Sequence, residues 1–387
     1  MEKQKNIPSL RFPEFNGTWE FTTLEDVAKI IDCKHITPQY IEFGIPVISP
    51  GTIKWGNIDL ESPTKRVSED DYKSLMNHCI PKYGDLVFSR NQSIGIACFL
   101  LKSEKFVLGQ DTVLIQPNNN QSLFTYFLIQ TQQVQTSIIK QSGGSTFARI
   151  NLKDIRNLKV KVTFSIPEQT KIATFLTSID DRLNQLKKKK TLLEEYKKGL
   201  MQKIFDQEIR FKDDNGNQYP DWKIKNLGEI STIATGSSNR EDSSLEGEYT
   251  FFDRSQDIRS SSIFLFDGEA IIVAGEGQEF IPKYFIGKFD LHQRTYSIMN
   301  FINANGKFLF YQIDKFRYYF FSQAVGSTVK SLRLPMFEKM PIQLPSVAEQ
   351  TKIANFLSAI DEKINGCTDQ IRKTDQYKKG LLQKMFC

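Results

Sequence analysis

The chain has 387 residues and a formal net charge of +6, from 51 Lys and Arg against 45 Asp and Glu. This length predicts two or three domains, and a 40% hydrophobic content is that of an ordinary globular protein. No apolar run approaches the roughly 18–20 residues that span a membrane, and the N-terminus lacks the apolar segment of a signal peptide, which predicts a cytoplasmic location and no membrane partner. Five scattered cysteines, none in a CxxC pair, predict free thiols and no zinc site.

Residues 1–165 are predicted to form the first globular domain. Short β-like runs between turn signals indicate strands at Ile45–Ile48, Gly84–Phe88 and Thr112–Ile115. One helical stretch is expected near Ser122–Lys140, and a Gly-Ser-Thr sequence follows it at 144–146. The mixture predicts an α+β domain.

Residues 166–205 are predicted to form one long helix. Apolar side chains alternate at spacings of four and three, which is typical of a coiled-coil seam. At 1.5 Å per residue, a helix of this size would be about 60 Å long. The predicted seam in this copy consists of Ile172, Leu176, Ile179, Leu183, Leu186 and Leu193.

Residues 206–346 are predicted to form a second α+β domain with the same plan. The opening Leu10-Arg11-Phe12 returns as Ile209-Arg210-Phe211, and Trp19 returns as Trp222. A strand is expected at Gly268–Val273 and a helical stretch near Asn305–Ala324, again ahead of a Gly-Ser-Thr sequence.

Residues 347–387 repeat the long helix. Residues 166–205 and 347–386 align without a gap at an offset of 181, and 19 of the 40 pairs are identical. We therefore predict an α+β fold in which two globular domains are separated by two long α-helices that pair as an antiparallel coiled coil, giving a pseudo-two-fold internal repeat. The predicted seam in the second copy consists of Ile353, Leu357, Ile360, Ile364, Ile371 and Leu381.

Aromatic side chains in the two helical stretches are predicted to be core residues, and base stacking is the alternative. They are Phe124, Tyr126, Phe127, Phe308, Phe310, Tyr311, Tyr318, Tyr319 and Phe320.

Nothing in the sequence resembles a catalytic constellation. Only three histidines exist, at 35, 78 and 292, and they are expected to stand apart from acidic and Cys partners, so neither a metal cluster nor a catalytic triad is predicted. There is no Walker A motif, and Gly275-Glu276-Gly277 lacks the third glycine of a dinucleotide loop. We expect a non-catalytic protein that binds no cofactor.

Polar loops at matching places in both halves are the candidates for DNA binding. Arg, Asn and Gln can form bidentate hydrogen bonds to guanine or adenine edges, while Ser, Thr and backbone N–H groups can hold phosphates. An alignment of the two halves pairs Arg90-Asn91-Gln92 with Ala274-Gly275-Glu276. The candidates are Arg90, Asn91, Gln92, Ser93, Ser145, Thr146 and Arg149 in the first half, and Arg254, Gln256, Arg294, Ser327, Thr328, Lys330 and Arg333 in the second.

Net charge does not carry the prediction of DNA binding. Residues 1–165 hold 19 basic and 16 acidic side chains, whereas residues 206–346 hold 16 and 19. The charges of the two predicted globular domains together sum to zero. Any positive surface must therefore come from the way basic side chains cluster locally.

The sequence resembles the specificity (S) subunits of type I restriction–modification enzymes, the HsdS family. The resemblance spans essentially the whole chain. It depends on LRFPEF followed by Trp19, on GDLVFSRNQSIG at Gly84–Gly95, and on the duplicated motifs EQTKIATFL/EQTKIANFL and YKKGLMQKIF/YKKGLLQKMF.

The resemblance implies two target-recognition domains, each of which reads one half of a bipartite double-stranded DNA target. The helix pair would fix the gap between the halves and bind two modification (methyltransferase) subunits. S-adenosylmethionine, ATP and Mg²⁺ are then expected on the partner modification and restriction motor–nuclease subunits. The alternatives are a coiled-coil interaction scaffold without DNA readout and a standalone DNA methyltransferase or nuclease.

Overall fold

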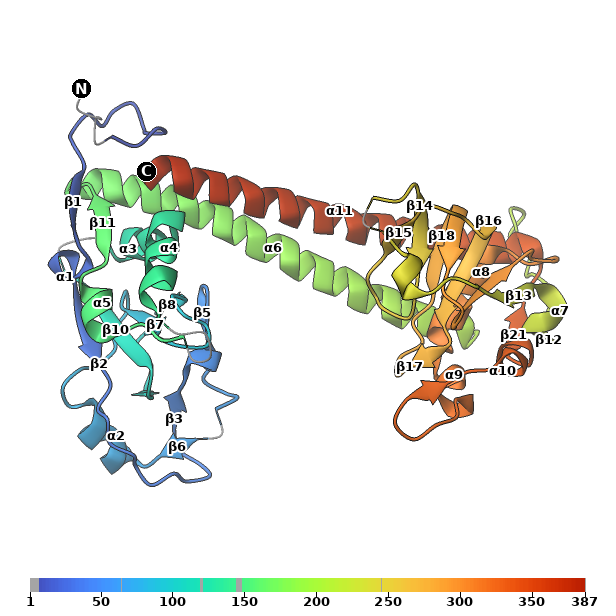
Figure 1. The fold of residues 1–387 in the computed structure, drawn as a ribbon, viewed down its shortest axis with the longest axis horizontal. Coiled ribbons are helices and arrows are strands. Elements are labelled where there is room, and N and C mark those ends of the chain that lie inside the picture. Colours follow the sequence, from blue (N-terminus) through green and yellow to red (C-terminus); the bar gives the residue numbers. More distant parts are fainter. Residues whose placement is uncertain (1–6, 64, 119–120, 144–147, 245, 387) are drawn as a thin grey trace. The chain divides into compact units, whose positions relative to one another are not determined.

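The computed structural model describes residues 7–63, 65–118, 121–143, 148–244 and 246–386 (Figure 1). Two compact units make up the chain. Unit 1 consists of Met1–Lys187 with Asp369–Cys387, and unit 2 consists of Lys188–Thr368. Each unit therefore contains a globular part, the first half of one long helix and the second half of the other.

Unit 1 is an α+β structure built on a four-stranded sheet. Its strands are β1 (Glu20–Thr23), β2 (Ala28–Asp32), β3 (Ile45–Ile48), β4 (Ile53–Lys54), β5 (Asn57–Ile58), β6 (Arg66–Val67), β7 (Leu86–Ser89), β8 (Ala97–Phe99), β9 (Val107–Leu108), β10 (Thr112–Pro117) and β11 (Lys159–Val162). The main sheet has the antiparallel order β2-β10-β7-β8, and β1 pairs with β11. Smaller sheets join β6-β3-β9 and β4-β5.

Unit 2 repeats this plan with additions. Its strands are β12 (Lys223–Asn226), β13 (Thr232–Thr235), β14 (Tyr249–Phe252), β15 (Arg259–Ser261), β16 (Phe266–Ala274), β17 (Glu276–Gly277), β18 (Lys283–Leu291), β19 (Thr295–Met299), β20 (Lys330–Ser331) and β21 (Pro341–Leu344). The main sheet has the order β13-β19-β16-β18-β14-β15, so its first four strands correspond to those of unit 1. The β12-β21 and β17-β20 pairs form two separate two-stranded sheets.

Apart from α2 (Glu69–Met76), the α-helices recur in the same order in the two halves of the chain. They are α1 (Leu24–Val27), α2 (Glu69–Met76), α3 (Ser122–Gln130), α4 (Gln132–Gln141), α5 (Leu152–Arg156), α6 (Ile166–Phe205), α7 (Leu227–Ile230), α8 (Gly306–Lys315), α9 (Tyr318–Gln323), α10 (Leu334–Glu338) and α11 (Val347–Phe386), with 3₁₀ turns η1 (Pro50–Thr52) and η2 (Arg240–Asp242). The α+β prediction is confirmed. The predicted strands are found as β3, β7, β10 and β16, and the two long helices as α6 and α11.

Each predicted helical stretch is in fact two helices. Thr131, between α3 and α4, has an extended backbone with φ −63° and ψ 145°, and its hydroxyl donates to Leu128 O at 2.8 Å. Because this bond satisfies a carbonyl at the end of α3, the first helix ends there and a second helix begins. The prediction that Tyr318 is a core residue is wrong, since it opens the short α9 and is 74% exposed.

A buried glutamate fixes α6 to the globular part of unit 1. Glu168, in the first turn of α6, is 1% exposed. Its carboxylate accepts from Arg11 Nε at 2.7 Å and Nη2 at 2.8 Å, from Trp19 Nε1 at 3.3 Å and from Thr163 Oγ1 at 3.0 Å. These bonds satisfy a charge that would otherwise be costly to bury, and they explain why LRF, Trp and EQ occur together in the sequence.

The same anchor recurs in unit 2. Glu349, at the start of α11, is completely buried. It accepts from Arg210 Nε at 3.1 Å and Nη2 at 2.8 Å and from Trp222 Nε1 at 3.2 Å. The motif residues of the two halves therefore make equivalent contacts.

The glutamine after each anchor ties the helix to its neighbouring loops. Gln169 Oε1 accepts from the Gln121 N–H at 2.8 Å, and Gln169 Nε2 donates to Thr163 O at 2.6 Å. Gln350 makes the equivalent pair of bonds with the Asn305 N–H and Pro345 O, at 2.7 and 2.9 Å.

Ion pairs between the long helices show that they run antiparallel within each unit. In unit 1, Lys378 Nζ lies 2.6 Å from Asp180 Oδ1. In unit 2, Lys197 Nζ lies 2.6 Å from Asp361 Oδ1. Both pairs join the Ile-Asp of one repeat to the YKKG of the other, at the offset of 181.

The C-terminal end of each long helix enters a globular core. Phe386 contacts the rings of Trp19 and Phe124 in unit 1, and Phe205 contacts those of Trp222 and Phe308 in unit 2. Of the predicted seam residues, Leu193, Ile364 and Ile371 are half-buried and the others are buried.

We predict that Glu349→Gln lowers the free energy of unfolding by about 2 kcal/mol or more, because it removes the counter-charge of Arg210 inside the anchor. Urea unfolding followed by circular dichroism and tryptophan fluorescence measures the change. Asp369→Asn on the same helix is the matched control. Asp369 pairs with Arg372 at the surface, so its loss should cost well under about 1 kcal/mol. Equal effects of the two substitutions would contradict the anchor.

Candidate nucleic-acid interface

Two adjacent strand ends and one later loop form the frame of the candidate site in unit 1. The Arg90 N–H, just after β7, donates to Asp111 O, just before β10, at 2.8 Å. The Ile150 N–H in turn donates to Arg90 O at 3.0 Å. The candidates Arg90 and Asn91 after β7 are therefore brought beside the candidate Arg149 and its neighbour Ile150.

The same frame exists in unit 2. The Gly275 N–H donates to Arg294 O at 2.9 Å, and the Leu332 N–H donates to Gly275 O at 2.8 Å. Arg90 therefore corresponds to Gly275, and Asp111 corresponds to Arg294. The sequence alignment of Arg90 with Ala274 is wrong by one residue, because the backbone bonds at the strand ends, rather than side-chain likeness, set the equivalence.

Arg90 does not present its side chain to solvent. It is 4% exposed, and its Nη1 lies 3.0 Å from both carboxylate oxygens of Asp32, while its Nε donates to Ile150 O at 3.2 Å. This geometry suits a residue that holds strand β2 and the 150 region together. A base contact from Arg90 would require it to break these bonds.

Asp111 binds the side chains of two other DNA-binding candidates in unit 1. Asn91 Nδ2 donates to Asp111 Oδ2 at 2.6 Å, and Arg149 Nε lies 2.5 Å from Asp111 Oδ1. The Arg149 side chain is 44% exposed. Asn91 and Arg149 also form an isolated antiparallel backbone bridge, so their main chains lie side by side.

The remaining candidates of unit 1 differ in accessibility. Gln92 is exposed, with a left-handed φ of 50°, and Ser93 is half-buried. Ser145 and Thr146 lie outside the described residues.

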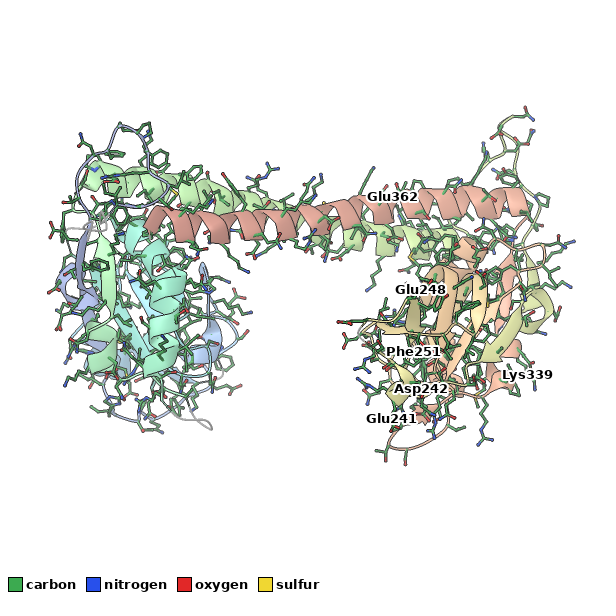
Figure 2. All side chains as sticks on the ribbon, turned by 45° about the horizontal axis from the view of Figure 1, so that its top comes forward. Glu241, Asp242, Glu248, Phe251, Lys339 and Glu362 are labelled. Atoms are coloured by element: carbon green, nitrogen blue, oxygen red, sulfur yellow. The ribbon has the colours of Figure 1, made fainter. Side chains whose placement is uncertain are left out.

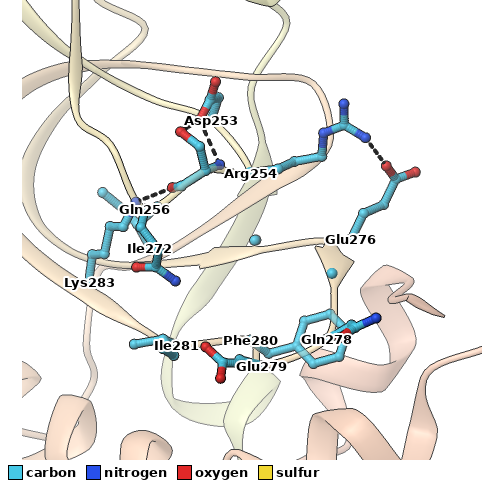
Figure 3. Close-up of a pocket in the computed structure, with 13 residues that line it drawn as sticks. Asp253, Arg254, Gln256, Ile272, Glu276, Gln278, Glu279, Phe280, Ile281 and Lys283 are labelled. Atoms are coloured by element: carbon cyan, nitrogen blue, oxygen red, sulfur yellow. Dashed lines mark hydrogen bonds and ion pairs between the residues drawn. The ribbon is translucent and has the colours of Figure 1, made fainter. Parts of the chain in front are cut away.

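In unit 2, one carboxylate binds two candidate arginines. Glu276 Oε2 is ion-paired with Arg254 Nη1, and its Oε1 is ion-paired with Arg294 Nη1 (Figure 3 draws the Arg254 pair). The Glu276 side chain is 12% exposed, whereas those of Arg254 and Arg294 are 49% and 59% exposed. We call these three residues the glutamate clamp.

The glutamate clamp borders a cavity of about 130 Å³ (Figure 3). Arg254, Glu276 and the candidate Gln256 line it, together with Lys283. Lys283 Nζ donates to Ser255 O at 2.6 Å, which fixes the turn that carries Arg254 and Gln256.

The Gly-Ser-Thr loop of unit 2 runs beside the clamp. Strand β20 pairs with β17, so Ser331 lies opposite Glu276 and Lys330 opposite Gly277. Gly326 has a φ of 110°, and a Cβ there would lie 2.3 Å from Val329 O, so the turn requires glycine. Ser327, Thr328 and Arg333 are exposed on this loop, and Lys330 is half-buried.

The Glu276 carboxylate of the clamp is held in its ionised form. Burial tends to raise the pKa of Glu276, but hydrogen bonds from Arg254 and Arg294 outweigh it and hold the pKa below its ordinary value. Burial, with the charges of both arginines, lowers the pKa of His292. Neutral His292 accepts from the Arg294 N–H at its Nδ1, at 3.0 Å, which fixes the backbone that carries the arginine.

The surface nearby is not uniformly basic. Three acidic side chains of unit 2, Glu241, Asp242 and Glu248, are exposed (labelled in Figure 2). An anionic ligand is therefore favoured only at the local basic clusters.

The expectation that His35 stands apart from acidic and Cys partners is wrong. Ligand atoms of Asp32, Cys33 and His35 lie within 4.8 Å of one another. Burial, and next the charge of Asp32, raises the pKa of Cys33 to about 11, and Arg90 already binds the Asp32 carboxylate. A thiol held protonated and three ligands instead of four make this a poor zinc site. The described cysteines at 33, 79, 98 and 367 are free, as predicted.

The acidic members of both clusters, Asp111 and Glu276, were not predicted from the sequence. A carboxylate repels phosphate, so acidic residues were not expected among the groups that meet DNA. Asp111 lies directly before β10, and Glu276 lies two residues after the end of β16. These positions were the available signal, because neighbouring strand ends lie side by side in a sheet.

Comparisons with known proteins identify the family to which this chain belongs. The sequence model of the family described as "Type I restriction modification DNA specificity domain" matches residues 16–195 and 219–373. The matches cover most of the chain, so the chain belongs to this family. The predicted resemblance and the predicted role in DNA specificity, rather than in catalysis, are thereby confirmed.

Individual relatives agree with the family. The chain is 25% identical over an alignment of 422 residues to the putative type I restriction enzyme MjaX specificity subunit of Methanocaldococcus jannaschii, covering 99% of this chain and 96% of that one. It is 29% identical over 166 residues to the EcoDI specificity subunit of Escherichia coli, covering 43% of this chain and only 37% of that subunit.

Solved structures share the fold. The crystal structure of a type I restriction–modification S subunit from M. genitalium has a TM-score of 0.64 at 16% identity, covering 98% of this chain and 99% of that one. A chain from a study of complex assembly and conformational transition of the type I R-M system has a TM-score of 0.57 at 13% identity, covering 96% and 98%. None of the helices in the described ranges combines the length and apolar content needed to cross a membrane.

We predict that Arg90→Ala lowers the free energy of unfolding by about 3 kcal/mol, because it leaves the Asp32 carboxylate partly buried without its cation. Arg149→Ala, which removes an arginine from the same frame but at the surface, should cost less than about 1 kcal/mol. Denaturant unfolding of both variants tests this. An Arg90→Ala protein as stable as the wild type would contradict this structural role, and Arg90 would again be a candidate for DNA contact.

Proposed function

We propose that each unit reads one half of a bipartite double-stranded DNA target, with readers at residues 1–165 and 206–346 and helices at residues 166–205 and 347–387. The observation that carries this proposal is the duplicated scaffold. The glutamate anchors, the interhelical Asp–Lys pairs and the strand-end frame recur, while the side chains placed on the frame differ. A duplicated frame with different side chains suits two readers with different targets.

The exposed polar side chains on the two frames are the proposed DNA contacts. Gln92 and Arg149 would serve the first half-site, and Arg254, Gln256 and Arg294 the second, because their donors can reach base edges. Ser327, Thr328, Lys330 and Arg333 suit phosphate contacts. Asn91 and Ser93 are secondary candidates, and Arg90 is proposed to position the frame.

The long helices are proposed to bind two modification subunits. Tyr196 and Tyr377 occupy equivalent positions in the repeat, and they are 56% and 57% exposed. Exposed aromatic side chains are common in protein interfaces, and a pair at equivalent positions suits two copies of one partner. S-adenosylmethionine, ATP and Mg²⁺ would act on the modification and restriction motor–nuclease subunits. The complex would work in the cytoplasm, where its DNA is.

The helices are further proposed to set the gap between the half-sites. We predict that inserting seven helical residues after Lys187 and another seven after Thr368 lengthens the gap by about three base pairs. The insertion adds about 10 Å of helix, against 3.4 Å per base pair, and preserves the heptad register. Sequencing of methylated sites in cells that express the variant with its partner subunits measures the gap.

The control inserts the same seven residues into the exposed turn Asp213–Asn217, where the gap should not change. An unchanged gap in the helix variant, with methylation retained, would contradict the ruler. Methylation without any sequence preference would instead favour the interaction scaffold.

A further inference from the structure

Each frame contains one carboxylate, but it lies at a different strand end in unit 1 and in unit 2. In unit 1 it belongs to Asp111, before β10, and the facing residue after β7 is Asn91. In unit 2 it belongs to Glu276, after β16, and Arg294 occupies the place of Asp111. Both frames thus keep one carboxylate that binds two donor side chains, although it lies on a different strand end in each frame.

We propose that Glu276 determines specificity at the second half-site by holding Arg254 and Arg294 as a pair that reads guanine edges. This inference rests on the proposed function of unit 2 as a DNA reader. It assigns Glu276 the role of a positioning residue, and the two arginines the role of base contacts.

The hydrogen-bond donors of the clamp are arranged for this task. Each arginine gives only its Nη1 to Glu276, and within the described ranges no bond is recorded for its Nε or Nη2. The Nε–Nη2 edge of a guanidinium matches the O6 and N7 acceptors of guanine, the commonest specific contact in the major groove. Both side chains are about half exposed, so these edges can meet DNA.

The clamp is held in place by its surroundings. A Cβ at Gly275 would lie 2.8 Å from Arg294 O and 2.8 Å from the Tyr296 ring, so only glycine allows the two strand ends to come this close. His292 fixes the backbone of Arg294 from the other side. A side chain that is already ordered loses less conformational entropy on binding.

A guanine edge fits the clamp better than a phosphate. A phosphate placed on the two arginines would also meet the Glu276 carboxylate, which is ionised and repels it. The guanine acceptors carry no net charge, so they gain the arginine contacts without this repulsion.

Unit 1 extends the same reasoning to a different target. Asp111 holds one arginine and one asparagine, Arg149 and Asn91, and Asn91 Oδ1 is a buried acceptor with no partner among the described residues. Arg149 gives its Nε to Asp111, so the Nε–Nη2 edge that the clamp leaves open in unit 2 is occupied in unit 1. The first half-site is therefore expected to differ from the second at these positions.

The test is DNA methylation by the full chain assembled with its modification subunits, read over a library of double-stranded DNA that varies both half-sites. Glu276→Gln should reduce discrimination at guanine positions of the second half-site by roughly 5- to 150-fold, the range for one bidentate contact, and leave the first half-site unchanged. Glu279→Gln, an exposed residue that lines the same cavity, is the matched control and should behave as the wild type.

A second variant keeps the test decisive if Glu276→Gln folds poorly. Arg294→Lys retains the charge but cannot donate two parallel hydrogen bonds, so it should lose guanine discrimination while keeping most of the overall affinity. Unchanged guanine preference in both variants, or weakening that is uniform over all sequences, would overturn the proposal. A wild-type complex with no bipartite preference would instead overturn the proposed function.

Discussion

The whole structure depends on a buried carboxylate at the start of each long helix. Glu168 and Glu349 are almost inaccessible to water, and a buried charge is tolerated only when its partners are in place. Arg11 and Trp19, or Arg210 and Trp222, supply those partners from more than a hundred residues away. This requirement fixes the beginning of each helix against the paired strands of its globular part, and it accounts for the motifs that the two halves share.

A fixed scaffold allows the side chains at the strand-end frame to differ between the two units. The frame at the ends of the central strands is made by backbone hydrogen bonds, which do not depend on side-chain identity. Arg90 can therefore stand where the other half has Gly275, and Asp111 where it has Arg294. On the proposed function, specificity resides in a few side chains that can be exchanged without changing the frame, as a DNA specificity protein of two halves requires.

Most of the fold was predicted from the spacing of apolar residues and from the internal duplication of the sequence. Both long helices and four strands follow from apolar spacing, because these elements bury one face. The breaks near Thr131 and the exposure of Tyr318 depend on local capping and on short helices that leave one side uncovered, which spacing does not encode. The candidate site was predicted only as loops. The burial of Arg90 and the part played by Glu276 arise from strands that are adjacent in space and distant in sequence, so composition could not reveal them.

The most direct test of two readers on one duplicated scaffold is the methylated target of a chimera. In it, residues 209–346 are replaced by residues 10–165, so that both units carry the first reader between unchanged helices. With the partner subunits present, methylation sequencing should find a target made of two copies of the first half-sequence, with the gap unchanged. A chimera that still methylates a target containing the original second half-sequence would contradict the account.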